Sequence, residues 1–196
     1  MIKKKLVIAS DTFLPRWDGV SRFLAEIVPR LSMKYDIKLV VPDFGRKIKI
    51  KNVNIVRIPV HKFMVGDYNP PKLKPRVIKR IIKDADIVFI QTIGLIGALA
   101  VYYACRFRKP LYAYTHSIEW ELVPKSIAKF KSAIAIITRV FARYIYNKCD
   151  FIFVPCEDTE RILTYAGIKP QKKIVYLGVN SNKFKPASNK ENAKKK

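Results

Sequence analysis

Short apolar runs alternate with stretches of helical periodicity along this chain of 196 residues. A continuous apolar run between turn residues is typical of a strand that is buried on both faces, as in a parallel sheet. The pattern predicts strands at Leu6–Ala9, Ile37–Val41, Val53–Val60, Ala85–Gln91, Leu111–Thr115, Phe151–Pro155 and Lys173–Leu177.

The segments between these runs place apolar residues on one helical face. The predicted helices are Val20–Leu31, whose apolar stripe continues past Pro29, and Pro75–Lys83, Gly94–Arg106, Lys125–Asn147 and Glu157–Ala166. Residues 117–124 are expected to form a loop. The alternation predicts an α/β fold, a Rossmann-like, doubly wound and mainly parallel sheet of about seven strands. We expect residues 1–180 to form this domain and the polar segment 181–196 to be a linker or tail.

The charge balance indicates an anionic partner. The chain has 39 Lys and Arg residues against 15 Asp and Glu residues, a net charge of +24. Such a field attracts nucleic acid, anionic membranes and phosphorylated substrates. No RNP, zinc-finger or helix-turn-helix signature is present, so specific nucleic-acid binding ranks behind the other two. Neither a signal peptide nor a transmembrane segment is predicted, and we expect a cytoplasmic location.

No metal or other cofactor is predicted. Cys105, Cys149 and Cys156 lack CxxC spacing and are expected to be reduced thiols in the core. Only His61 and His116 could join them as metal ligands.

The loop after the first strand is the first candidate site. In an open parallel sheet, ligands bind at the carboxyl ends of the strands, beside helix N-termini that attract phosphate. The loop lacks the GxGxxG pattern of dinucleotide-binding domains and has Asp18 and Gly19 before the helix instead. These residues suit a diphosphate, or else Asp18 only caps the helix and Gly19 only relaxes the turn.

His116 is the second candidate, since it follows the fifth predicted strand and should lie at the same sheet edge as Asp11 and Gly19. An imidazole there can exchange hydrogen bonds with a sugar hydroxyl. The alternative is a histidine at a strand end that bonds only to the backbone.

The segment from Lys72 to Lys83 combines an apolar stripe with a basic face, which is typical of helices that lie in a membrane interface. Any surface helix also packs its apolar stripe on a sheet, and both uses are compatible if only the charges meet lipid. The helix predicted at Lys125–Asn147 has an unusually wide apolar surface. We expect that surface to pack in the core, with a second membrane or protein contact as the alternative.

These residues together resemble the N-terminal domain of GT-B fold retaining glycosyltransferases of family 4. The resemblance rests on Asp11–Pro15 with Asp18–Val20, on Tyr114–Ser117, on Cys149–Pro155 and on Gly178–Pro186, which is similar to the junction between the family's two domains. The basic helix and the loop after His116 look most like members that glycosylate lipids, such as diacylglycerol glucosyltransferases and phosphatidylinositol mannosyltransferases.

The resemblance implies roles for individual residues. Gly19 matches the second glycine of a pair that approaches the donor diphosphate, although Asp18 occupies the first position. His116 matches the histidine that contacts the donor sugar at the reaction site. Lys72 matches the basic entry to the acceptor helix, where a lipid head-group phosphate would lie. Asp11 and Arg16 line the loop and are further candidates for acceptor binding. The resemblance further implies a site without metal. The basic face of the Lys72–Lys83 segment gives the expected membrane contact, through Lys74, Arg76, Lys79, Arg80 and Lys83.

The family's second domain, which supplies most contacts to the nucleotide-sugar and a Glu-x7-Glu motif, has no counterpart in this sequence. The expected function is therefore the acceptor-binding half of a glycosyltransferase, inactive without its C-terminal domain, with a membrane lipid or phosphorylated acceptor. The alternatives are a glycosyltransferase for a soluble sugar or polysaccharide, and a non-catalytic module that binds anionic lipid or a partner. If the acceptor is a membrane lipid, we expect the protein to lie peripherally on the inner face of the plasma membrane.

Overall fold

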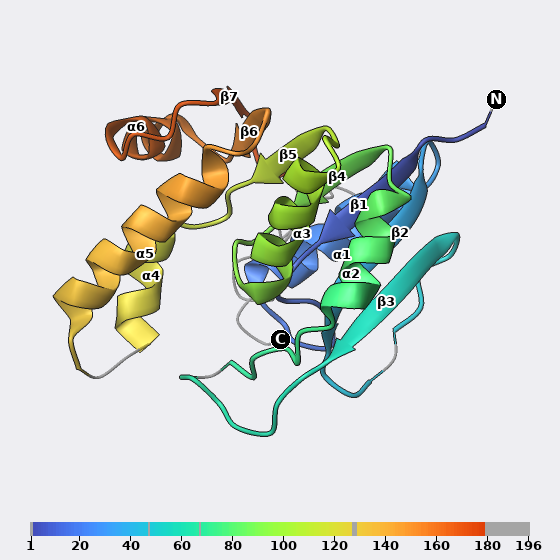
Figure 1. Cartoon of the computed structure of the whole chain (residues 1–196), viewed down its shortest axis with the longest axis horizontal. Coiled ribbons are helices and arrows are strands. Elements are labelled where there is room, and N and C mark those ends of the chain that lie inside the picture. The colour runs from blue at the N-terminus through green and yellow to red at the C-terminus, as the bar shows by residue number, and fades with distance from the viewer. Residues whose placement is uncertain (1, 47, 67, 127–128, 179–196) are drawn as a thin grey trace, which may run out of the picture.

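One parallel sheet organises the chain in the computed structural model, which describes residues 2–46, 48–66, 68–126 and 129–178. Its strand order is β3-β2-β1-β4-β5-β6-β7 (Figure 1). The strands are β1 (Lys5–Ala9), β2 (Asp36–Asp43), β3 (Val53–Pro59), β4 (Ile87–Ile90), β5 (Leu111–Tyr114), β6 (Phe151–Val154) and β7 (Gln171–Ile174). The α/β, Rossmann-like sheet predicted from the sequence is confirmed.

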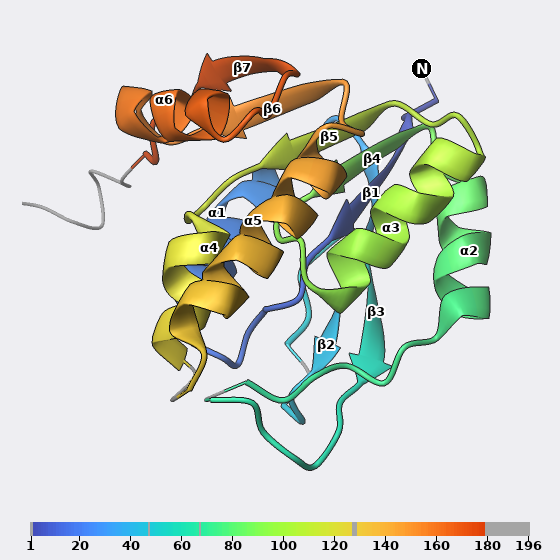
Figure 2. The ribbon, with the colours of Figure 1, turned by 60° about the vertical axis from the view of Figure 1, so that its left-hand side comes forward.

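Helices lie on both faces of this sheet. They are α1 (Gly19–Leu31), α2 (Pro75–Lys83), α3 (Leu95–Arg106), α4 (Glu119–Leu122), the short 3-10 helix η1 (Val123–Ser126), α5 (Lys131–Tyr146) and α6 (Glu157–Tyr165). Figure 2 shows α2, α3 and α5 along one face of the sheet and α1 behind the strands. The reversal of strand order after β1 places its loop at a switch point, the usual ligand site of such sheets.

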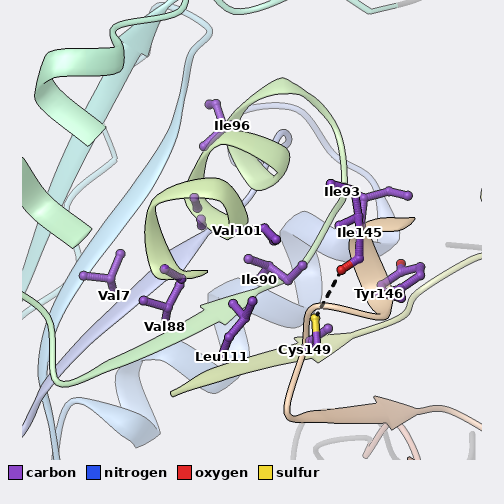
Figure 3. Packing of buried hydrophobic residues seen from close by; sticks show 14 of the residues in the cluster. Val7, Val88, Ile90, Ile93, Ile96, Val101, Leu111, Ile145, Tyr146 and Cys149 are labelled. Atoms are coloured by element: carbon purple, nitrogen blue, oxygen red, sulfur yellow. Dashed lines mark hydrogen bonds between the residues drawn. The ribbon is translucent and has the colours of Figure 1, made fainter. Parts of the chain in front are cut away.

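The two faces of the sheet bury separate cores because successive side chains of a strand point in opposite directions. Val7 and Ala9 of β1 belong to the larger core, which includes the buried side chains of α2, α3 and α5 (Figure 3). Leu6 and Ile8 of the same strand pack on the other face, in a core shared with α1. On that second face Phe89, Tyr112 and Phe153 are partly exposed and border an apolar cavity of about 380 Å³.

Three predicted boundaries are wrong. The helix expected at Lys125–Asn147 begins only at Lys131, since η1 precedes it and Phe130 has a left-handed backbone conformation. The expected loop 117–124 contains the helical turn α4. The seventh strand lies at Gln171–Ile174, where it pairs with β6, rather than at Lys173–Leu177. The proposed linker 181–196 lies outside the described residues.

The end of β1 is joined to α3 by a buried carboxylate. Asp11, 6% exposed, accepts hydrogen bonds from the backbone N–H groups of Ile96 (2.7 Å) and Gly97 (3.1 Å) and from the Thr92 hydroxyl (2.8 Å). Glycines make this approach possible. A Cβ at Gly94 would lie 2.5 Å from the Asp11 carboxyl carbon, and one at Gly97 would lie 1.9 Å from the Thr92 carbonyl oxygen.

We therefore expect Gly97→Ala to lower the free energy of unfolding by about 2 to 3 kcal/mol, because the added methyl collides with backbone. Gly19→Ala is the matched control. Its Cβ would meet no atom within 4 Å, so its unfolding free energy should change by less than about 1 kcal/mol. Urea denaturation of both variants measures the difference. Equal stabilities would show that α3 does not need its close approach to the loop after β4.

Candidate functional site

A cavity of about 750 Å³ opens at the carboxyl edge of the sheet. Five residues singled out from the sequence border it: Asp11, Arg16, Asp18, Gly19 and His116. They come from the loop after β1, the start of α1 and the end of β5. The apolar wall of the cavity comes from α4, η1 and α5, with Leu122, Val123, Ile137 and Phe141. The same elements also contribute Glu119, Ser126 and Thr138 to the lining.

The entrance to α1 has its expected form. Asp18 is the N-cap, and its Oδ1 accepts a hydrogen bond from Ser21 N (2.8 Å). Its Oδ2 accepts from the Thr12 hydroxyl and from Arg16 Nε, the latter at 3.2 Å. The Asp18 carboxylate is thus fully engaged by protein donors. Gly19 is exposed beside open space, so that a ligand can approach the N–H groups of Gly19 and Val20, which have no partner within the helix.

His116 bonds to a residue that the sequence analysis did not select. Its Nε2 lies 3.0 Å from Oε1 of Gln91, at the end of β4. Burial lowers the pKa of His116 to about 4, against the opposing effect of the Asp18 carboxylate. The ring is therefore neutral at pH 7. Because Gln91 Oε1 accepts, Nε2 carries the proton and Nδ1 remains an acceptor for a ligand hydroxyl.

Glu119 is a second residue of the cavity that sequence reasoning missed. It is the first residue of α4, and its Oε1 accepts a hydrogen bond of 2.5 Å from the hydroxyl of Tyr146 on α5. Burial raises the pKa of Glu119 to about 7, although the Tyr146 bond lowers it. The carboxyl group can therefore be a donor or an acceptor near neutral pH.

Three residues of the cavity wall bury a side-chain polar atom that has no hydrogen-bond partner: Gln91 Nε2, Glu119 Oε2 and Tyr68 Oη. An unpaired buried polar atom costs about 1 to 3 kcal/mol. Donors and acceptors are both present among them, which suits the hydroxyl groups of a sugar or a glycerol. These atoms lie on three different segments of the chain. The sequence did carry a signal for two of them, because Gln91 is a polar residue directly after β4 and Glu119 is a polar residue at the end of the loop after β5.

Of the basic residues predicted to bind the acceptor or the membrane, only Arg16 borders the cavity. Arg16 pairs with Asp18 and lies 6.0 Å from the centre of the Tyr68 ring. Lys72 is exposed and is not among the residues that border the cavity. Arg80 and Lys83, at the far end of α2, border a different groove beside Asp84.

The helix α2 cannot insert its apolar face into lipid, because Ile78, Ile81 and Ile82 are buried against the sheet. Its basic side chains Lys74, Arg76, Lys79, Arg80 and Lys83 are exposed. The interpretation of this segment as a helix packed on the sheet is thus confirmed, and only its charges remain available to a partner.

The described part of the chain contains neither a candidate metal cluster nor a candidate membrane span. Within those ranges no group of three or more His, Cys, Asp and Glu side chains could hold a metal ion. No helix among them is long and apolar enough to cross a membrane. The expectation that all cysteines lie in the core is wrong, since Cys149 is buried but Cys105 and Cys156 are exposed.

Residues 17–183 match the profile of Glycosyltransferase Family 4, a range that includes α1, His116 and every strand except β1. The chain belongs to this glycosyltransferase family. No match was found among the curated proteins. The family 4 profile thus agrees with the resemblance seen in the sequence.

Two solved structures share the fold of this chain. Sucrose-phosphate synthase from Thermosynechococcus elongatus superposes with a TM-score of 0.63 at 10% identity, over 95% of this chain and 51% of that one. Anabaena HepE, solved with UDP and glucose, superposes with a TM-score of 0.60 at 13% identity, over 95% of this chain and 48% of that one. The family 4 chain described here spans about half the length of these structures.

The raised pKa of Glu119 predicts a pH-dependent penalty. Above pH 7 the folded protein holds an ionised buried carboxylate, whereas the unfolded chain ionises near pH 4.5 at no such cost. Stability is therefore lost as the pH rises from about 4.5 to about 7. Between about pH 5 and about pH 8, the stability of Glu119→Gln relative to the wild type should rise by about 2 to 3 kcal/mol.

Urea denaturation of the variant and the wild type measures this difference. The comparison is needed because the lowered pKa of His116 makes wild-type stability rise with pH between about 4 and about 6.5, the opposite sign. Glu121→Gln, on the exposed side of α4, is the matched control and should follow the wild type. A Glu119→Gln curve parallel to the wild type would contradict the burial of this carboxyl group.

Proposed function

We propose that this chain is the acceptor-binding half of a retaining glycosyltransferase that transfers a sugar from a nucleotide-sugar to a membrane lipid. The observation that carries the proposal is the mixed lining of the cavity, where unpaired buried polar atoms and large apolar side chains border the same space. A lipid with a hydroxyl-bearing head group combines the same two kinds of chemistry. A soluble sugar phosphate would leave the apolar wall of α4 and α5 unused.

The donor would lie between this domain and a second one. The N–H groups of Gly19 and its neighbour in the first turn of α1 suit one side of a diphosphate. His116 would contact the donor sugar, and its neutral ring accepts a hydroxyl hydrogen bond through Nδ1. Anabaena HepE, with UDP and glucose bound, supports a nucleotide-sugar donor. None of these contacts would require a metal ion.

The acceptor would occupy the other side of the cavity. Gln91 Nε2 and Glu119 Oε2 would bond to its hydroxyl groups, while Leu122, Ile137 and Phe141 would contact its apolar part. Asp11 would act indirectly, by holding α3, because both of its carboxylate oxygens are engaged. Lys72 would meet a head-group phosphate only outside the cavity. The protein would work in the cytoplasm, at the inner face of the plasma membrane.

Binding of a short-chain acceptor tests this proposal directly. The chain has two tryptophans, and Trp17→Phe leaves Trp120, next to Glu119, as the single fluorescent probe. We expect saturable changes of its emission with dioctanoylglycerol and none with glucose 6-phosphate. Gln91→Leu should weaken binding about tenfold by removing a buried donor. Gln171→Leu, at the exposed start of β7, is the matched control.

A response to glucose 6-phosphate alone would favour a soluble acceptor and overturn the lipid assignment. A response to neither compound would overturn the assignment of the cavity as an acceptor site.

The chain by itself should transfer no sugar, because it offers only one side of the donor site. We expect no label in the lipid fraction when the purified 196-residue protein is incubated with labelled UDP-glucose and dioctanoylglycerol. Label that accumulates with time and enzyme concentration would show that the domain is catalytically complete.

A further inference from the structure

The helix α5 presents an apolar face to solvent. It buries only Ala142, Ile145 and Tyr146, which lie near its C-terminal end. Ile136, Ile137 and Val140 are 65%, 67% and 63% exposed. The rest of the helix packs on α4 and η1, beside the sheet (Figures 1 and 2).

The exposed apolar side chains form one continuous surface. Ile137, Val140, Phe141 and Tyr144 follow the i, i+3, i+4, i+7 spacing that places side chains on one face of a helix. Leu122 of the adjoining α4 is also exposed. We call the surface of Leu122, Ile136, Ile137, Val140, Phe141 and Tyr144 the α4–α5 patch. A soluble protein rarely leaves so many large apolar side chains of one helix in water.

The charges around the patch indicate what covers it. The exposed Glu121 precedes Leu122 on α4, but the sequence from Leu122 to Cys149 contains no Asp or Glu and has six basic residues, Lys125, Lys129, Lys131, Arg139, Arg143 and Lys148. Two copies of such a surface would repel each other. An anionic bilayer complements it, since apolar side chains enter the acyl boundary while basic ones remain at the head groups. Lys148 lies 5.2 Å from the centre of the Tyr144 ring, so a basic and an aromatic group meet at one end of the patch.

The patch is continuous with the cavity. Ile137 and Phe141 border the cavity and are also exposed members of the patch. A bilayer on the patch would therefore lie beside the apolar wall, within reach of the polar end formed by Gln91, His116 and Glu119. The relation to acceptor entry rests on the proposed function, whereas docking itself rests on the patch alone.

We propose that the α4–α5 patch docks on an anionic lipid bilayer and inserts its apolar side chains at the interface. The amphipathic sequence of α2 suggested a membrane contact at α2, but the apolar residues of α2 are buried against the sheet. We assign the membrane contact to the α4–α5 patch instead.

Vesicle sedimentation with the full chain tests this proposal. We expect binding to vesicles of equal parts phosphatidylglycerol and phosphatidylcholine, and at least about tenfold weaker partition to phosphatidylcholine alone. Ile136→Ser with Val140→Ser, which changes no charge and lies outside the cavity, should weaken partition about tenfold or more. Lys79→Ser with Arg80→Ser on α2 is the control pair and should weaken it less than about threefold.

A second measurement reports insertion without depending on affinity. In a background with Trp17→Phe and Trp120→Phe, the tryptophan placed by Val140→Trp should shift to the blue with vesicles and be quenched by brominated acyl chains, whereas Lys79→Trp should show neither effect. Both positions are exposed, so the thermal melts of the two variants should match that of the background protein.

Equal partition of the α5 pair and the wild type would overturn the proposal, as would a larger loss in the α2 pair. Absence of vesicle binding together with self-association that Ile136→Ser and Val140→Ser abolish would assign the patch to a protein contact instead. Docking that persists while dioctanoylglycerol fails to bind the cavity would leave the patch assignment intact and remove the acceptor assignment.

Discussion

The carboxylate of Asp11 is the interaction on which the geometry of the site depends. It lies at the end of β1 and accepts bonds from N–H groups of α3, 85 and 86 residues later in the chain. Three donors and a helix N-terminus offset the loss of water around a buried carboxyl group. This bond fixes the loop after β1 against the end of β4, so that Gly19, Gln91 and His116 border one cavity. Gly94 and Gly97 are required there because any side chain would occupy the contact.

The polar end of the cavity is close to neutral although the protein carries a net charge of +24. Arg16 is paired with Asp18, His116 is uncharged at pH 7, and Glu119 titrates near neutrality. The excess of basic residues is therefore a property of the outer surfaces. The groups inside the cavity therefore offer hydrogen bonds rather than a strong charge, which would suit a ligand with hydroxyl groups. The lowered pKa of His116 and the raised pKa of Glu119 have one cause, since both groups are buried with few compensating charges.

The sequence predicts the sheet well because strands buried on both faces are continuous apolar runs, as in Leu6–Ala9. It also predicts that His116 lies near Asp11 and Gly19, since a parallel arrangement brings the carboxyl ends of the strands to one edge of the sheet. It does not indicate that Asp11 bonds to Ile96 or that Glu119 bonds to Tyr146, because such partners depend on tertiary contacts. Local periodicity likewise misses η1, where a positive φ at Phe130 separates two helical segments of similar composition.

The helices α2 and α5 show why amphipathic periodicity alone does not identify a membrane contact. Both carry apolar residues at helical spacing beside basic ones. The apolar face of α2 packs on the sheet and on α3, so Ile78, Ile81 and Ile82 are buried. Only the last turns of α5 reach the core, whereas its earlier turns rest on α4 and leave Ile136 and Val140 in solvent. Whether an apolar stripe faces a sheet or a bilayer depends on what the fold places beside it. The short α4, formed where a loop is expected, is one of the elements on which α5 packs.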